Sequence, residues 1–238
     1  MKMRRYNLPL LASRYSIVLC LLPTLLFWSC QQQNSFEYTQ NATGIAFTLD
    51  SLTKRVAFYG EDMVRVSLAR QGQAFKDSSL VIVAKPESID FSVEDGQELT
   101  LKTGRLNVRV NKQTGSITFE GENGMSYLSE HPQIAPVLED TTINDATFYR
   151  IKQAFQISDP EGLYGLGQFQ NGNLNLRGKA LQLVQANKIA VVPFLVSTKN
   201  YGVLWENYSH STFRDGTDGM WFTAEVADQI DYFFVAGQ

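Results

Sequence analysis

Apolar and polar residues alternate along most of this chain, and that alternation limits the possible folds more than any other feature of the sequence. Alternating or continuous apolar stretches occur at residues 64–68, 106–110, 117–119, 148–157, 191–196, 201–205, 220–226 and 230–235. Successive side chains of a β-strand point to opposite faces, so a period of two predicts strands. After Cys30, no window of a dozen residues has the period of an amphipathic helix. The sequence therefore predicts an all-β domain.

Residues that favour tight turns separate these stretches and predict an antiparallel β-sandwich. They fall at residues 95–96, 114–115, 122–124, 199–200 and 215–216. Residues 111–115 lie between two alternating stretches and predict a hairpin. Residues 191–196 are apolar without interruption, which predicts a strand buried on both faces. Because no fixed repeat is visible, we expect one domain, residues 44–238, with its strands in two packed sheets.

The first 30 residues have the order of a secretory signal. A basic start precedes an apolar stretch at residues 17–28, and Ser29, Cys30 and a polar run follow. The apolar stretch is interrupted by Pro23 and is short for a membrane-spanning helix. A cysteine directly after a small residue resembles a bacterial lipoprotein cleavage site. We therefore expect acylation of Cys30 and a polar tether at residues 31–43; ordinary signal cleavage, with Cys30 incidental, is the alternative.

The composition argues against several kinds of site. The net charge is −3, and without the basic first 29 residues it is −7, which argues against a nucleic-acid partner. Two histidines and two cysteines are too few for a Cys/His zinc centre or a disulfide framework. Residues 215–219 lack the later glutamate of a calcium loop, and the glycines at 165 and 167 lack the third glycine of a dinucleotide-binding motif. We expect neither a metal nor another cofactor.

Acidic residues and histidines do not form a clear catalytic set in the sequence. Glycoside hydrolysis usually needs two carboxyl groups, about 5–9.5 Å apart, that flank the bond to be broken. We interpret the acidic candidates as solvated turn charges, because neighbours on a strand point to opposite faces; they are Glu61-Asp62, Glu139-Asp140 and Asp215 with Asp218. Neither histidine lies near a nucleophile-elbow sequence, so structural or surface roles are favoured for His131 and His210.

Side-chain amides are concentrated between residues 168 and 175. The predicted substrate-binding set consists of Gln168, Phe169, Gln170, Asn171 and Asn173. Amides both donate and accept hydrogen bonds, which suits sugar hydroxyls. Burying amides without partners would cost about 1–3 kcal/mol each, so we expect an exposed loop that joins two strands at one edge of the sandwich. A polar loop without a binding role is the alternative.

Glycines and aromatic residues add two weaker signals. Three glycines between residues 165 and 172 predict unusual backbone angles. Trp205, Tyr208 and Trp221 are weaker candidates for contacts with sugar, because an aromatic residue in a strand is more often part of the core.

Six blocks of residues, in order, resemble the N-terminal domain of glycoside hydrolase family 31. The blocks are residues 163–168 (Leu-Tyr-Gly-Leu-Gly-Gln), 171–178 (Asn-Gly, then Asn-Leu-Arg-Gly), 185–187 (Gln-Ala-Asn), 192–197 (Val-Pro-Phe-Leu-Val-Ser), 201–209 (Tyr-Gly-Val-Leu-Trp-Glu-Asn-Tyr-Ser) and 230–237 (Ile-Asp-Tyr-Phe-Phe-Val-Ala-Gly). The resemblance extends over residues 36–238 and is nearest to bacterial α-xylosidase and α-glucosidase lipoproteins. Phe169 departs from that branch, where histidine is expected.

The resemblance implies a fold, a reaction and a partner. The fold is a galactose-mutarotase-like β-sandwich that packs against a (β/α)8 barrel and sends a loop toward the sugar site. The barrel carries both catalytic aspartates, so we expect this chain to be inactive alone, with the missing barrel as its partner. The implied reaction is retaining hydrolysis of α-glycosides, with oligosaccharides such as xyloglucan fragments as substrates.

The resemblance also implies export to the periplasm or the outer membrane of a Gram-negative bacterium, with membrane contact only through the lipid anchor. Two other functions remain open. One is a stand-alone sugar-binding periplasmic lipoprotein. The other is an aldose epimerase, which would need His131 or His210 together with a carboxylate.

Overall fold

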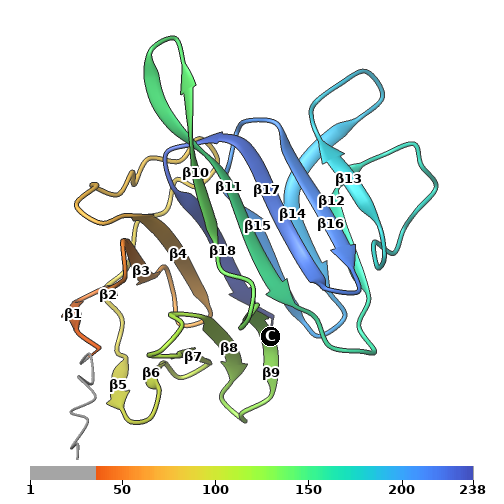
Figure 1. Ribbon diagram of the computed structural model, residues 1–238. Helices are drawn as coiled ribbons and strands as arrows, with labels where there is room; N and C mark the ends of the chain where they lie inside the picture. Colours follow the sequence, from red (N-terminus) through yellow and green to blue (C-terminus); the bar gives the residue numbers. More distant parts are fainter. Residues whose placement is uncertain (1–35, 238) are drawn as a thin grey trace, which may run out of the picture. The chain divides into compact units, whose positions relative to one another are not determined.

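The computed structural model describes residues 36–237, which form two antiparallel β-sheets and, within that range, no helix (Figure 1). The smaller sheet has eight strands. In spatial order they are β1 (Tyr38–Asn41), β2 (Gly44–Leu49), β3 (Leu52–Phe58), β4 (Met63–Arg70), β18 (Ile230–Ala236), β15 (Tyr201–Trp205), β14 (Ala190–Ser197) and β12 (Leu163–Gln168). The last strand of the chain thus lies between an early hairpin and the later strands.

The larger sheet has ten strands. Nine follow one path: β13 (Ala180–Leu183), β16 (Ser211–Gly216), β17 (Gly219–Ala227), β11 (Ala146–Gln156), β9 (Ser126–Glu130), β8 (Ile117–Gly121), β7 (Leu106–Val110), β6 (Leu99–Lys102) and β5 (Ser92–Asp95). The tenth, β10 (Val137–Ile143), pairs with β11. Both sheets therefore mix strands from the two halves of the chain.

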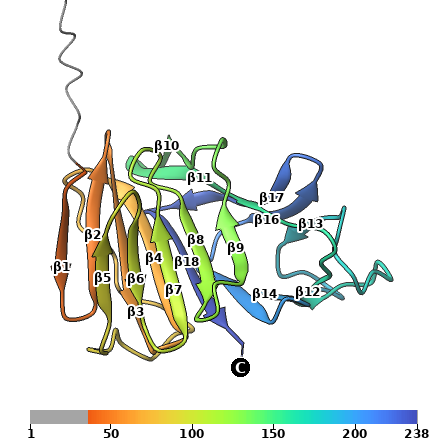
Figure 2. The same ribbon diagram turned by 90° about the horizontal axis from the view of Figure 1, so that it is seen from below.

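The two sheets enclose one main core. Figure 2 shows β5–β9 as a layer beside β2, β3, β4 and β18. Phe119 on β8 stacks on Phe234 of β18 with ring centroids 4.1 Å apart, and Phe155 on β11 meets Tyr232 of β18 edge-on at 5.2 Å. Such aromatic pairs add to the stabilisation from burial. The predicted antiparallel β-sandwich is confirmed.

A buried ion pair also joins the two sheets. Lys54 on β3 lies 2.6 Å from Glu130 Oε2 on β9 and donates to Gly115 O at 2.8 Å. Tyr232 OH on β18 donates to Glu130 Oε1 at 2.9 Å. Because an unpaired buried charge is costly, each of these groups stabilises the position of the others.

The predicted hairpin at residues 111–115 and the predicted burial of residues 191–196 had different outcomes. The hairpin at residues 111–115 is confirmed: it joins β7 to β8, and Gly115 has a φ of 68°. Residues 191–196 lie in β14, but the prediction of burial on both faces is wrong, because Val192 is 56% exposed and Val196 41% exposed. β14 is one strand from the sheet edge, and one of its faces stays open to solvent.

The N-terminal assignments lie partly outside the described residues. Residues 38–41 do not belong to a tether, since they form β1 and pair with β2. Cys30 and the predicted signal lie outside residues 36–237. Within the described range, no helix is long and apolar enough to cross a membrane.

Candidate functional site

The amide-rich loop connects the two sheets at their edges. It follows β12, the outermost strand of the smaller sheet, and leads into β13, the outermost strand of the larger sheet (Figure 1). Gln168, Gln170, Asn171 and Asn173 are exposed, whereas Phe169 is half-buried and packs against the core. The loop is thus exposed at an edge, as expected from its amides. Sugar binding by these residues stays a prediction.

Some of the amides shape the loop and others are free. Asn175 Oδ1 accepts hydrogen bonds from two backbone N–H groups, at 3.1 and 3.2 Å, and so closes the base of the loop. Asn171 Oδ1 accepts from the backbone N–H of Asn173 at 3.1 Å and shapes the tip. Within the described residues, the side chains of Gln168 and Gln170 have no hydrogen-bond partner. A ligand can therefore bond to these two side chains without breaking the loop.

The strand that leads into the loop has an unusual backbone. Three consecutive residues have positive φ: Gly165 at 99°, Leu166 at 61° and Gly167 at 108°. A Cβ atom on Gly167 would lie 2.0 Å from Ala190 O on β14. The predicted unusual angles are confirmed, and the close approach of β14 leaves no room for a side chain at Gly167. Strained backbone of this kind is found at functional sites more often than elsewhere.

Arg177 fixes the other end of the loop. Its Nε donates to Asp215 Oδ2 at 2.8 Å, Nη1 donates to Glu161 O at 2.9 Å, and Nη2 donates to Asp159 Oδ1 at 2.9 Å. The backbone N–H of Gly178 donates to the same Asp215 oxygen at 2.6 Å. Burial acts to lower the pKa of Arg177, but the hydrogen bonds and charges of Asp215 and Asp159 together outweigh it and raise the pKa overall. The arginine therefore stays charged at this position.

Asp215 corrects one of the sequence interpretations. It is 5% exposed and lies at the end of β16, so it is not a solvated turn charge. Its partner Arg177 is 38 residues away in the sequence, and no local pattern links the two. The turn itself is formed by the residues between β16 and β17.

An open groove lies beside the base of the loop. It has a volume of about 710 Å³, and its lining includes His131, Arg177, Lys179, Arg214 and Asp215. Charges of both signs line it, so it suits polar ligands better than apolar ones. Among residues 36–237, no group of three or more Asp, Glu, His or Cys residues could hold a metal ion.

The two histidines serve as hydrogen-bond partners within the fold. His131 Nδ1 accepts hydrogen bonds from the backbone N–H groups of residues 133 and 134, at 3.2 and 3.0 Å. His210 contacts Gln182 through Nε2 and lies 3.1 Å from Glu225 through Nδ1. Both ring nitrogens of His210 are therefore engaged with neighbouring side chains.

Three of the other acidic candidates, Glu61, Asp62 and Asp140, contact arginines on the surface. Arg105 lies 3.8 Å from Glu61 and 3.5 Å from Asp62, and Arg70 lies 3.4 Å from Asp140. These pairs agree with the interpretation of these residues as surface charges. They offer no pair of free carboxyl groups around a groove.

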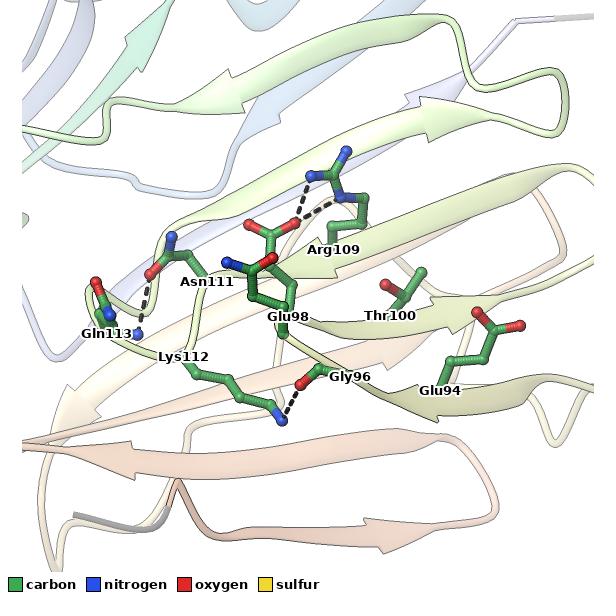
Figure 3. A pocket seen from close by; sticks show the side chains of 9 residues that line it. Glu94, Gly96, Glu98, Thr100, Arg109, Asn111, Lys112 and Gln113 are labelled. Atoms are coloured by element: carbon green, nitrogen blue, oxygen red, sulfur yellow. Dashed lines mark hydrogen bonds and ion pairs between the residues drawn. The ribbon is translucent and has the colours of Figure 1, made fainter. Parts of the chain in front are cut away.

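A second hollow, of about 520 Å³, lies over β5, β6 and β7 (Figure 3). Each of its charged side chains has an oppositely charged partner: Arg109 is paired with Glu98 and Glu120, Lys112 with Asp95, and Glu94 with Lys102. Because these charges neutralise one another, this hollow is a weaker candidate than the loop and its groove.

The three aromatic candidates differ in exposure. Trp205 is fully buried and Trp221 is 8% exposed, whereas Tyr208 is 55% exposed. Lys152 and Arg214 cover the Trp221 ring, at 4.2 and 5.0 Å from its centre. Among the three, only Tyr208 presents a ring that a ligand can reach.

Comparison with known proteins identifies one family. Residues 53–213 match the model of the glycosyl hydrolase 31 N-terminal galactose mutarotase-like domain. The chain is 28% identical over 202 residues to an α-xylosidase of Saccharolobus solfataricus, a match that covers 79% of this chain and 27% of that protein. It is 26% identical over 222 residues to an uncharacterized family 31 glucosidase of Pseudescherichia vulneris, covering 84% of this chain and 41% of the other.

Solved structures give the same result. A GH31 α-xylosidase from a soil metagenome, complexed with xylose, superposes with a TM-score of 0.74 at 25% identity, covering 85% of this chain and 32% of that one. A GH31 α-xylosidase from Xanthomonas citri has a TM-score of 0.69 at 30% identity, covering 75% of this chain and 20% of that one. This chain spans less than half the length of each of these relatives.

Proposed function

The chain belongs to glycoside hydrolase family 31 through its N-terminal galactose mutarotase-like domain, and we propose that this domain supports the sugar site of a retaining α-glycosidase. The observation that carries the proposal is the amide loop at residues 168–175. Gln168 at its start and Gln170 have side chains without a hydrogen-bond partner in the described residues, and both of its ends are held, one by the Gly165–Gly167 backbone and the other by Arg177. Rigid support of this kind holds polar groups in position for a ligand.

The substrates of the proposed enzyme are α-xylosides or α-glucosides, for example the α-xylose side chains of xyloglucan fragments. The similarity to α-xylosidases and to a family 31 glucosidase supports this choice. In this proposal the two catalytic carboxylates lie on a (β/α)8 barrel outside this chain, and the domain binds to that barrel. The ion pairs of Glu61, Asp62, Asp140 and Asp215 support this division, because each of these carboxylates already contacts an arginine.

Hydrolysis assays test the proposal directly. The protein expressed from the whole gene should hydrolyse aryl α-xylosides or α-glucosides, whereas the 238-residue chain should not exceed the buffer rate. Gln168→Ala or Asn171→Ala in the whole protein should lower kcat/KM about tenfold, equivalent to ~1.4 kcal/mol, with little change in melting temperature. Gln113→Ala is the matched control, because Gln113 is an exposed amide in the distant β7–β8 hairpin.

Other results would redirect the assignment. Turnover by the 238-residue chain alone would contradict the placement of the carboxylates. Loss of stability without any kinetic change in the two loop variants would make the loop a structural turn. A whole-gene product that binds oligosaccharides but hydrolyses none would favour a stand-alone sugar-binding lipoprotein.

Export and lipidation form the second part of the proposal. The basic, apolar and small-residue order before Cys30 supports acylation of its thiol, which would anchor the protein in the periplasm or at the outer membrane. A palmitate analogue supplied to a bacterial host should label the wild type and not Cys30→Ser. Equal labelling of both proteins would refute lipidation at Cys30.

A further inference from the structure

A third pocket, of about 490 Å³, lies where three segments meet. They are the irregular stretch at residues 76–80, the residues that follow β15, and the connection between β17 and β18. Its lining includes Lys76, Leu80, Glu206, Tyr208, Asp228 and Asp231. None of these residues belongs to the amide loop.

Glu206 is the unusual member of this lining. Its side chain is buried, with the residue only 8% exposed, and Oε1 accepts a hydrogen bond from Tyr208 OH. Oε2 is buried and has no hydrogen-bond partner among the described residues. No lysine, arginine or histidine of residues 36–237 forms an ion pair with it. A buried carboxylate without a second donor is costly, so a partner for Oε2 would stabilise the site.

The other charges of the pocket are already balanced. Lys76 Nζ lies 2.7 Å from Asp228 Oδ2. Arg65 Nε donates to Asp231 Oδ1 at 2.9 Å, and Gln229 Nε2 donates to Asp231 Oδ2 at 2.9 Å. Glu206 is therefore the acceptor that the fold leaves incomplete in this pocket.

The rim of the pocket offers an aromatic ring and an apolar side chain. Tyr208 is 55% exposed and Leu80 is 81% exposed. Leu80 N donates to Tyr208 OH at 2.6 Å, so the two rim residues are held together. An exposed tyrosine beside hydroxyl groups and a carboxylate suits a ligand that has C–H surfaces and hydroxyl groups.

We propose that this pocket binds one unit of a neutral oligosaccharide, with a sugar hydroxyl donating to Glu206 and the sugar ring resting against Tyr208. The uncompensated Glu206 carboxylate disfavours an anion, and the hydroxyl groups and tyrosine ring around it suit a neutral sugar. In this proposal the Tyr208 side chain moves away from Glu206 and so exposes Oε2, which is shielded in the free protein. The choice of α-glucan and α-xylose sugars as ligands rests on the proposed function, whereas the preference for a neutral hydroxyl donor rests on the pocket.

Titration calorimetry on the whole 238-residue chain tests this site without any need for hydrolysis. The probes are maltotriose, isomaltotriose and a xylose-bearing xyloglucan heptasaccharide. At least one should bind saturably, and Glu206→Gln should weaken that binding at least about tenfold, as for loss of a charge-assisted hydrogen bond. Tyr208→Ala, which alters an exposed side chain, should also weaken it. Gln113→Ala, which alters an exposed amide of the β7–β8 hairpin, should change it less than twofold.

Three outcomes would overturn the proposal. One is the absence of saturable binding of any of the three sugars to the wild type. Another is binding that Gln170→Ala abolishes and Glu206→Gln and Tyr208→Ala leave intact, which would place the sugar at the loop and leave the proposed function standing. The third is that methylammonium chloride stabilises the protein and none of the three sugars does. The pocket would then be a cation site.

Discussion

Removal of the Asp215 carboxylate should destabilise the domain through the base of the amide loop. Asp215→Ala removes the acceptor of two hydrogen bonds, from Arg177 Nε at 2.8 Å and from Gly178 N at 2.6 Å. The side chains of the ion pair are 26% and 4% exposed, so solvent replaces little of what is lost. Hydrogen bonds to charged groups contribute about 1.5–3 kcal/mol each, and Arg177 keeps two other partners. We therefore expect a loss of about 3 kcal/mol.

A thermal melt followed by circular dichroism measures this loss. For a domain of this size, 3 kcal/mol corresponds to a decrease in melting temperature of about 6–12 °C. Asp159→Ala is the matched control: it removes another carboxylate that contacts Arg177, but one whose side chain is 86% exposed. Exposed pairs contribute little, so this variant should melt within about 2 °C of the wild type.

Limited proteolysis locates the effect in the chain. Asp215→Ala should expose the loop around Gly172 to early cleavage, while Asp159→Ala should be cut like the wild type. Equal decreases in melting temperature for both variants, or an unchanged cleavage pattern in Asp215→Ala, would refute the claim that Asp215 holds the base of the loop.

Three further predictions concern the strands and the core. Burial, and after it the Glu161 carboxylate, raises the pKa of Tyr201 above its usual value of 10.0. Because the pKa is higher in the folded state than in the unfolded state, the protonated phenol contributes its full stabilisation below about pH 10. Above that pH, the free energy of unfolding falls by about 1.4 kcal/mol per pH unit. In urea unfolding between pH 9 and 11.5, the free energy of unfolding should decline less with pH for Tyr201→Phe than for the wild type. Gly167→Ala should unfold at clearly lower urea than Gly172→Ala, because the new Cβ would lie 2.0 Å from a carbonyl oxygen of β14 in the first case and meets no atom within 4 Å in the second. Lys54→Met should cost about 3–5 kcal/mol in chemical unfolding by leaving Glu130 charged and unpaired, and adding Glu130→Gln should restore part of the loss.

The strand pattern could be predicted from the sequence because alternation and turn chemistry are local. The hairpin at residues 111–115 and the positive φ at Gly165, Gly167 and Gly172 follow from residue type alone. The solvent exposure of one face of β14 could not be predicted in this way, since it depends on which strands lie beside β14 and on what covers them. Four residues of the supposed tether form β1 for a similar reason: pairing with β2 outweighs their polar composition.

The candidate site shows the same difference between local features, which the sequence predicts, and features that depend on folding. The exposed amides could be found because they are consecutive in the chain. Asp215 and Glu206 were not identified, because their roles depend on partners brought in by folding: Arg177 for the first, and the pocket at residues 76–80 for the second. A carboxylate beside a glycine or within an aromatic block carries no local sign of burial.

The way in which the amide loop is held has a consequence for evolution. Its two ends are fixed by backbone geometry and by Arg177, while Gln168 and Gln170 have no partner in the fold. Substitutions of these two side chains are therefore nearly free of folding constraints, and substitutions at the ends of the loop are not. Descendants of this domain can acquire new side chains at these positions, one at a time, without first acquiring mutations that restore stability. We expect related chains to keep the glycines and the arginine and to vary at Gln170 before they vary at either end of the loop.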